Sequence, residues 1–266
     1  MASSNDSSDS AGNYTFSYAH GTVMVFAWMI FAPIGILIAR YGRLLRIGVR
    51  QQLFGDTIWF QVHRLALSLA ALVTLLGFFL ILVQAQSTWV DVNSDGQLLY
   101  AHSILGVLIV CFAMTQVWMA LFRCHPDGKF RFIYNWAHRT TGVLAFVLSV
   151  PTIFIVTYWL PAYHNGFVAI LSLWTAWVVI VVVAFEFLEH RGKASRKLSK
   201  NHYEIRQTAY ELSEIDHHQQ SEAAVVENEE LESNVVNKAK LILLSIHVIV
   251  SIALAIPLIV LIWQQN

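Results

Sequence analysis

Cysteine and charge are both scarce in this sequence. The two cysteines, Cys111 and Cys124, are too few for a disulfide framework, and there is no Cys-x-x-Cys pair for zinc or thiol redox chemistry. Charged side chains make up only 13% of the 266 residues, against 56% hydrophobic ones, and the net charge is zero. This balance excludes an ordinary water-soluble domain, and the zero net charge gives no support to nucleic-acid binding. The composition is that of an integral membrane protein.

Motifs for nucleotide cofactors are also absent. The sequence has neither a Gly-x-Gly-x-x-Gly fingerprint nor a P-loop, and it leaves no room for a flavin domain. A transporter is disfavoured because no pair of glycine- and proline-broken spans indicates an inverted repeat. The first nineteen residues lack the basic start and apolar stretch of a cleavable signal peptide. We therefore expect a first span that acts as a signal anchor, or a piece of a longer chain.

Long apolar runs are what the sequence has instead. Six of them are long enough, at about 1.5 Å per helical residue, to cross a hydrocarbon core of roughly 30 Å. They predict an all-α integral membrane protein with six transmembrane helices, near residues 22–39, 61–83, 101–122, 138–160, 166–188 and 241–263. We divide the chain into an outer N-terminal segment (1–19), a transmembrane core (20–190), a cytosolic basic-then-acidic linker (191–240) and a C-terminal transmembrane anchor (241–266).

The lysines and arginines determine the expected orientation, because cytoplasmic connections are enriched in them. With the N-terminus outside or lumenal, the inner connections hold five between residues 40 and 64, four between 123 and 139, and eight between 191 and 240, which is all 17 in the chain. The outer segments hold two glycosylation sequons, at Asn5 and Asn13. We expect a multi-pass glycoprotein of the plasma membrane or of an endomembrane vesicle.

The linker changes sign along its length. Its basic start predicts contact with anionic membrane lipid. Its acidic remainder predicts a solvated tail that is partly helical or disordered.

Four histidines occupy matched depths in the first four spans. His20 and His102 begin spans that run inward, so both lie near the outer face, whereas His63 and His138 begin spans that run outward and lie near the inner face. Alternate helices of a four-helix bundle face each other across its core. Two opposed imidazoles can ligate one haem iron axially, so the two levels predict a di-haem four-helix bundle. One such histidine alone is more often a packing residue, but the matched depths of all four favour ligation.

Glycines close to these histidines support the same interpretation. The pattern Ala-His-x-x-x-Gly occurs twice and ends in Gly106 and Gly142. A glycine one turn beyond a ligand leaves room for the flat face of a porphyrin. Gly77 lies fourteen residues beyond His63 on roughly the same helix face, and it is predicted to line the outer haem.

These motifs resemble the cytochrome b561 superfamily, in the branch whose membrane core follows a DOMON domain, as in ferric-chelate reductases. The resemblance covers about residues 14–190 and is carried by YAHGTVMVFAWMIFAPIGILIARYGR, VHRLAL, HSILG and YNWAHRTTG. It implies two b-type haems, with His20 paired to His102 and His63 to His138, and outward electron transfer that reduces ferric iron. The depth argument gives the same pairing. No DOMON domain precedes the core in this sequence, so we expect a fragment or a minimal form.

Haem iron exchanges one electron at a time, so a small diffusible reductant is expected on the cytosolic side. Arg40, Arg43, Arg64 and Arg139 lie near the inner histidines and are predicted to dock an anionic donor such as ascorbate. The alternative is that they anchor the membrane edge or a haem propionate. On the outer side, His164 is predicted to receive a ferric chelate, although an ordinary solvated loop is the alternative.

Two other functions stay open from the sequence. One is a quinol-oxidising membrane cytochrome b, and the other is a non-redox scaffold or receptor that has kept the bundle. A homodimer is also left open. Thr115 and Gln116 either hydrogen-bond the inner haem or join helices, and His247 in the last span has no predicted partner.

Overall fold

The computed structural model describes residues 14–42, 52–53, 56–122, 128–212 and 218–265. Within these ranges, six helices are long and apolar enough to cross a membrane, which confirms the predicted all-α multi-pass protein. Apolar runs fold this way in a bilayer because a helix satisfies its backbone hydrogen bonds internally. We number the spans 1 to 6, and they cover Thr15–Tyr41, Ile58–Gln84, Gln97–Leu121, Arg131–Trp159, His164–Ala194 and Val235–Trp263.

Span 1 is made of three elements, whereas the next two spans are single helices. Span 1 contains α2 (Thr15–Val25), the π-helix η1 (Phe26–Phe31) and α3 (Ala32–Tyr41). Spans 2 and 3 are α4 (Ile58–Gln84) and α6 (Gln97–Leu121). Span 4 is α7 (Arg131–Val156) followed by the 3-10 turn η2 (Thr157–Trp159). Spans 5 and 6 lie within α8 (His164–Leu212) and α9 (His218–Trp263).

The connections contain short elements that the sequence did not predict. Two-residue strands β1 (Gln52–Leu53) and β2 (Asp56–Thr57) pair in antiparallel register before α4, with Leu53 opposite Asp56. The turn α5 (Val92–Asp95) precedes α6, and Gly96 between them has a φ of +88°, a left-handed backbone that glycine adopts without strain. The 3-10 turn η3 (Pro161–Tyr163) leads into α8.

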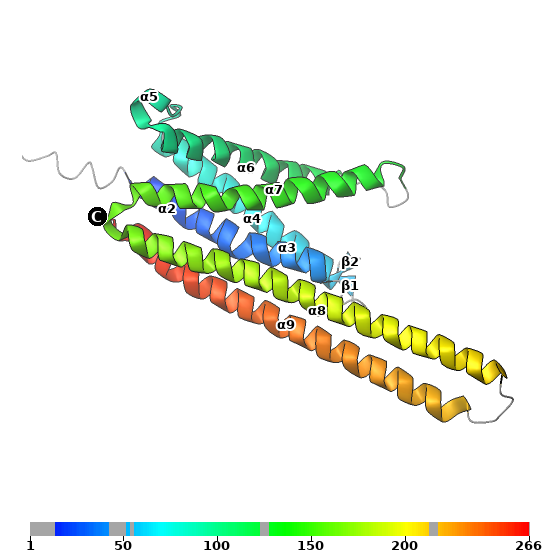
Figure 1. Cartoon of the computed structure of the whole chain (residues 1–266). Helices are drawn as coiled ribbons and strands as arrows, with labels where there is room; N and C mark the ends of the chain where they lie inside the picture. The colour runs from blue at the N-terminus through cyan, green and yellow to red at the C-terminus, as the bar shows by residue number, and fades with distance from the viewer. Residues whose placement is uncertain (1–13, 43–51, 54–55, 123–127, 213–217, 266) are drawn as a thin grey trace, which may run out of the picture.

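Helices α8 and α9 form a long antiparallel hairpin on one side of span 1, and α4, α6 and α7 lie on its other side (Figure 1). The hairpin extends past the ends of the other helices. Residues 201–240, predicted to be a solvated and partly helical or disordered tail, are helical through Leu212 and again from His218.

One apolar layer joins the first four spans. Its buried residues include Ala27 from η1, Ala70 from α4, Ile109 from α6 and Ala145 from α7. Each of these four residues lies seven positions, or about two helical turns, beyond the histidine of its own span. The layer therefore packs the bundle between the two histidine levels, with Trp28 as its one large aromatic side chain among the buried members.

A second apolar cluster attaches spans 5 and 6 to span 1. It contains Val25 and Met29 from span 1, Phe167 and Trp174 from α8, and Leu258 from α9. A buried ion pair also joins the hairpin, since Lys240 Nζ lies 2.6 Å from Glu189 Oε2 and the two side chains are only 2% and 3% exposed. The last two spans are thus packed onto the bundle rather than standing apart from it.

Candidate functional site

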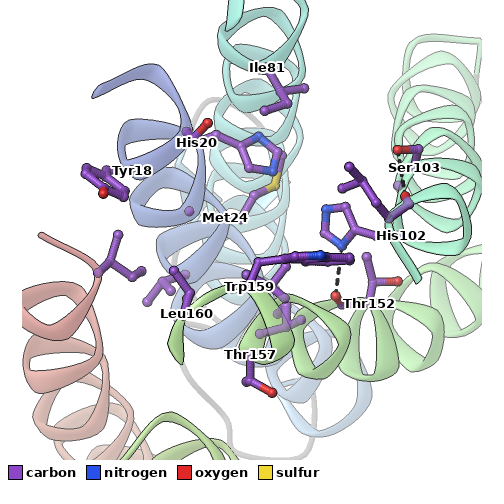
Figure 2. Close-up of a pocket in the computed structure, with 18 of the residues that line it drawn as sticks. Tyr18, His20, Met24, Ile81, His102, Ser103, Thr152, Thr157, Trp159 and Leu160 are labelled. Carbon is purple, nitrogen blue, oxygen red and sulfur yellow. Dashed lines mark hydrogen bonds between the residues drawn. The ribbon is translucent and has the colours of Figure 1, made fainter. Parts of the chain in front are cut away.

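His20 and His102 face each other across one end of the bundle. We call their level, predicted to lie near the outer face, the upper level, and the level of His63 and His138 the lower level. His20 comes from α2 and His102 from α6, and their ring centroids lie 6.3 Å apart at an interplanar angle of 74°. Figure 2 shows both imidazoles turned into the same cavity. Two metal–imidazole bonds of about 2 Å, with each ring centroid about 1 Å beyond its nitrogen, place the centroids of an axial pair about 6 Å apart. The spacing of this pair fits ligation of one metal by both rings.

Each ring of this pair is held through its Nδ1 atom. His20 Nδ1 donates to the Gly77 carbonyl oxygen at 2.8 Å, and His102 Nδ1 donates to the Thr152 carbonyl oxygen at 3.0 Å. A carbonyl can only accept, so Nδ1 carries the proton and Nε2 keeps its lone pair. This is the arrangement of a metal-ligating histidine, in which the second nitrogen fixes the tautomer and the orientation of the ring.

The two rings line an apolar cavity of about 1040 Å³. Cofactor pockets commonly reach roughly 1,000 Å³ and are lined mainly by apolar groups. Gly106 opens onto this cavity, because a Cβ atom built there has no neighbour within 4 Å. Thr74 also lines it, with its buried hydroxyl left without a hydrogen-bond partner in the described residues. The predicted role of Gly106 is consistent with this geometry, and the residues present fit a haem that His20 and His102 would hold.

At the lower level, His63 has the same kind of anchor. His63 from α4 donates through Nδ1 to the Gly35 carbonyl oxygen of α3 at 3.1 Å. His138 on α7 stacks on Tyr134, with ring centroids 6.1 Å apart and an interplanar angle of 6°. The pairing of His63 with His138 stays a prediction.

The carbonyl acceptors follow a spacing rule. Gly77 lies fourteen residues beyond His63, Thr152 fourteen beyond His138, and Gly35 fifteen beyond His20. In these three bonds, the histidine of one helix donates to a main-chain carbonyl of the neighbouring antiparallel helix. That carbonyl lies about four turns beyond the neighbouring helix's own histidine. The sequence analysis missed these acceptors, because a main-chain carbonyl leaves no residue type to recognise.

The glycines at two of these acceptors allow close helix packing. A Cβ atom at Gly77 would lie 2.6 Å from Met24 Cε, and one at Gly35 would lie 2.5 Å from Leu67 Cδ2. Gly77, predicted to make room for a haem, instead makes room for α2 to approach α4. At Gly142 a Cβ atom would lie 3.3 Å from the side-chain oxygen of Gln116, so this glycine does not face open space.

Polar groups of span 3 are engaged within the helices. Gln116 donates from Nε2 to Thr141 Oγ1 of α7, so it joins the two helices, as one of its two predicted roles required. Thr115 donates to the Cys111 carbonyl of its own helix.

Trp159 is a cavity residue that the sequence analysis missed. Its ring meets that of His102 edge to face, with centroids 6.1 Å apart, and 38% of its surface is exposed (Figure 2). It therefore lies between the histidine level and the surroundings of the bundle. In the sequence, Trp159 and the tyrosine before it form an aromatic pair at the end of span 4. Such a pair is also typical of an ordinary membrane interface, so it did not indicate a cavity residue.

The predicted substrate residues differ in their surroundings. Arg40 donates from Nε and Nη2 to Glu186 Oε1 of α8, at 3.2 and 3.1 Å, so its guanidinium is already paired with a carboxylate. Arg64 is exposed and lies over the ring of Phe60, 5.9 Å from the centroid. Arg139 is exposed, and Arg43 lies outside the described residues.

At the other end of the bundle, His164 donates from Nδ1 to the Thr157 carbonyl at 2.9 Å, which closes the turn between spans 4 and 5. The sequons at Asn5 and Asn13 and the cysteine at position 124 lie outside the described residues. His247 is fully buried in α9, and neither of its ring nitrogens has a hydrogen-bond partner among the described residues. Where the chain is described, no group of three or more His, Cys, Asp or Glu side chains could hold a metal ion, and a haem with two axial histidines requires no such group.

Several curated proteins are similar to this chain. A Drosophila melanogaster protein named as a homolog of ferric-chelate reductase 1 is 32% identical over 203 residues, which is 76% of this chain and 28% of that protein. Human ferric-chelate reductase 1 is 29% identical over 136 residues, or 51% of this chain and 22% of its own length. A cytochrome b561 and DOMON domain-containing protein of Arabidopsis thaliana is 29% identical over 137 residues, or 51% of this chain and 30% of its own length. No protein-family model and no solved structure matches the chain.

The fold defines a multi-pass membrane protein, and about half of the chain is similar to a cytochrome b561 and DOMON domain-containing protein. More narrowly, the other two of these relatives are named as ferric-chelate reductase 1 and its homolog, so the chain is similar to the proteins that it resembled in the sequence. The match spans less than a third of the length of each of these three relatives.

Proposed function

We propose that this chain is a transmembrane di-haem b-type cytochrome that passes single electrons from a cytosolic reductant, ascorbate, to a ferric chelate on the opposite face. The observation that carries the proposal is the pair of His20 and His102, 6.3 Å apart across an apolar cavity and each anchored through Nδ1. The names of the relatives, which include ferric-chelate reductase 1 and cytochrome b561, support the same activity.

When bound, haem b supplies reversible one-electron chemistry. His20 and His102 would hold one haem, and His63 and His138 would hold the other. The apolar layer between the two levels excludes water and keeps the helices at a fixed spacing. The levels are separated by about fourteen helical residues, or roughly 21 Å. An inside-negative membrane potential favours outward movement of each electron by about 2.3 kcal/mol per 100 mV.

The donor site lies at the His63 end. Arg64 and Arg139 directly follow the two inner histidines and are exposed, so an anionic donor such as ascorbate can reach them from solvent. Arg40 contributes less to this site because Glu186 already neutralises it. Arg43 remains part of the predicted set, and His164 remains the predicted acceptor-side residue.

The first test is the haem content of the purified chain. The expected result is two b-type haems per polypeptide, with the absorption bands of a reduced b-type cytochrome after addition of dithionite. His20→Ala and His102→Ala each remove one haem, and the double variant removes no more than either single variant. A folded and colourless preparation rules out the redox function and leaves the scaffold or receptor.

The second test is electron transfer across a bilayer. Vesicles that contain the purified chain are loaded with ascorbate, and reduction of an external ferric chelate is followed. His63→Ala abolishes the reduction because the inner level is lost, whereas His247→Ala, the matched control on another membrane-embedded histidine, leaves it intact.

A quinol donor is the second candidate, and one observation favours it. The cavity that holds His20 and His102 is also lined by Phe167 and Leu171 from α8 and by Leu258 from α9, an apolar surface that suits a membrane-soluble donor. Reduction of the purified protein by a quinol and not by ascorbate identifies that function.

A further inference from the structure

The regular α-helix of span 1 is interrupted at its centre. In η1, residues Phe26–Phe31, the chain adopts π-helical hydrogen bonding, and the backbone N–H of Ala32 donates to the carbonyl of Ala27, five residues earlier. Pro33 follows directly. A proline has no N–H, so the carbonyl of Met29, four residues before it, loses its α-helical donor. Single π-turns of this kind are frequent at functional sites.

Span 5 supplies a replacement donor. The indole Nε1–H of Trp174, on α8, donates to the Met29 carbonyl at 3.3 Å, and Trp174 is only 1% exposed. Leaving a buried carbonyl without a partner costs about 1–3 kcal/mol, so this bond stabilises the open π-turn. Its donor comes from a helix outside the four-helix bundle.

The π-turn changes the spacing along span 1 by one residue. Span 2 needs fourteen residues to run from His63 to the acceptor Gly77, but span 1 uses fifteen to run from His20 to the acceptor Gly35. Both bonds between the two helices nevertheless close, at 2.8 Å and 3.1 Å. In an unbroken α-helix, the additional residue would turn Gly35 by about 100° and shift it by about 1.5 Å relative to His20. The wider π-turn absorbs this additional residue.

Gly35 has little freedom to compensate by moving. A Cβ atom there would lie 2.5 Å from Leu67 Cδ2 and 3.4 Å from Ala66 Cβ, so α3 and α4 are in close contact at this position. The acceptor of a ligating histidine fixes its tautomer and orientation and raises its basicity. The orientation of His63 therefore depends on the register of α3, and that register depends on the π-turn.

We infer that Trp174 and Pro33 are positioning residues for the lower ligand His63, acting through the π-turn of span 1. The inference rests on the proposed function, in that His63 ligates a haem. It gives span 5 a specific role, because a helix outside the bundle sets the properties of one of the two cofactors and leaves the other unchanged.

The decisive variant is Trp174→Phe, which removes the indole N–H and keeps an aromatic ring in the cluster. The purified di-haem protein is titrated potentiometrically and its low-spin EPR signals are recorded, with the lower haem assigned by its loss in His63→Ala. The expected result is a shifted midpoint potential and a changed EPR signal for the lower haem. The upper haem keeps both values, which shows that the bundle is folded.

Trp177→Phe is the matched control. Trp177 lies one turn further along α8, and its indole nitrogen is buried without a hydrogen-bond partner in the described structure. Its substitution changes a neighbouring indole to phenyl without touching Met29, so both haems keep their potentials and signals. A shift of the same size in Trp177→Phe would show that the effect is general repacking and would overturn the inference.

Pro33→Ala tests the other residue. Alanine restores the N–H, lets the Met29 carbonyl regain its helical donor, and allows the π-turn to close. The expected result is weaker retention of the lower haem, by about tenfold or more in affinity, as for loss of other groups that orient a metal ligand. Pro257→Ala, at a proline inside α9 that is remote in sequence from every ligand, serves as the control and leaves both haems in place.

The outcomes separate the inference from the proposed function. A wild-type protein without haem refutes the proposed function. If the wild-type protein binds two haems but the lower haem is unchanged in both Trp174→Phe and Pro33→Ala, the inference alone is refuted.

Discussion

Each histidine assigned to the upper level donates one ring N–H to a main-chain carbonyl and keeps the lone pair of its other ring nitrogen. His20 and His102 donate Nδ1–H to main-chain carbonyls on neighbouring helices, and His63 does the same at the lower level. The depth of these histidines could be predicted from charge and hydropathy alone. Their acceptors could not, because a carbonyl on another helix depends on how the helices rotate against each other.

Gly106 offers a test at this scale. The change Gly106→Leu places a large side chain where a Cβ atom has only open cavity around it, and it costs nothing in hydropathy or helix propensity. We expect the protein to insert and fold but to lose the haem of the His20 level, so that the haem content falls from two per chain to one. A pyridine haemochrome assay on the purified protein measures this ratio.

Leu108→Phe is the matched control, since Leu108 lies two residues further along α6 and is 43% exposed. It enlarges a side chain on the outer surface of the same helix and leaves both haems bound. Two haems in Gly106→Leu would show that this part of the cavity is not the haem site.

At the scale of helices, regular spacing along the chain accounts for the positions of the packing residues and of the carbonyl acceptors better than residue type does. The residue seven positions after each of the four histidines belongs to the central layer, and the residue fourteen or fifteen positions after three of them is a carbonyl acceptor. Two and four helical turns return a side chain to nearly the same face, so the layer was predictable in principle. The π-turn was not, because Pro33 is visible in the sequence but its compensating donor, Trp174, comes from a helix 141 residues away.

The pair of Lys240 and Glu189 provides a test of the hairpin. Lys240→Met removes the ammonium group 2.6 Å from the Glu189 carboxylate, which is 3% exposed, and leaves Lys193 at 3.5 Å. Breaking a buried ion pair from one side typically costs about 3 kcal/mol or more, whereas replacing both partners by apolar groups is often neutral. We therefore expect Lys240→Met to lower stability by about that amount and Lys240→Met/Glu189→Met to recover most of it.

Thermal unfolding in detergent, followed by circular dichroism, measures the stability of both variants. Lys238→Met, two residues earlier on an exposed position of α9, is the control and has little effect. If the double variant is as unstable as the single one, the pair does not act as a unit.

At the scale of the whole molecule, the distribution of basic residues predicts which end faces the cytosol. All 17 lysines and arginines fall in the connections assigned to the inner side or in the span ends next to them. In intact cells, we expect added trypsin to leave residues 191–240 uncut and to cleave them once the membrane is permeabilised. Removal of N-linked glycans should increase the gel mobility of the chain, because the sequons at Asn5 and Asn13 are predicted to lie on the outer side. Cleavage of the linker in intact cells would reverse the assignment.

The number of spans and the resemblance to cytochrome b561 were both predicted from the sequence and confirmed. What the sequence did not reveal is how the last two spans are used. A C-terminal anchor and a helix that packs on the bundle have the same apolar composition, and only the contacts of Trp174, Phe167 and Leu258 with span 1 distinguish them. Tertiary pairing of this kind carries no local signal in an apolar run.

Two of the nine tryptophans, Trp28 and Trp159, line the cavity that contains His20 and His102. Porphyrins absorb strongly where indoles emit, so a porphyrin in this cavity quenches the fluorescence of both side chains by energy transfer. The tryptophan fluorescence of the protein therefore reports cofactor binding, and it can be measured in dilute detergent solution without any label. Emission that falls as haem is added, and falls less after Trp28→Phe and Trp159→Phe, follows occupancy of the His20 level in real time.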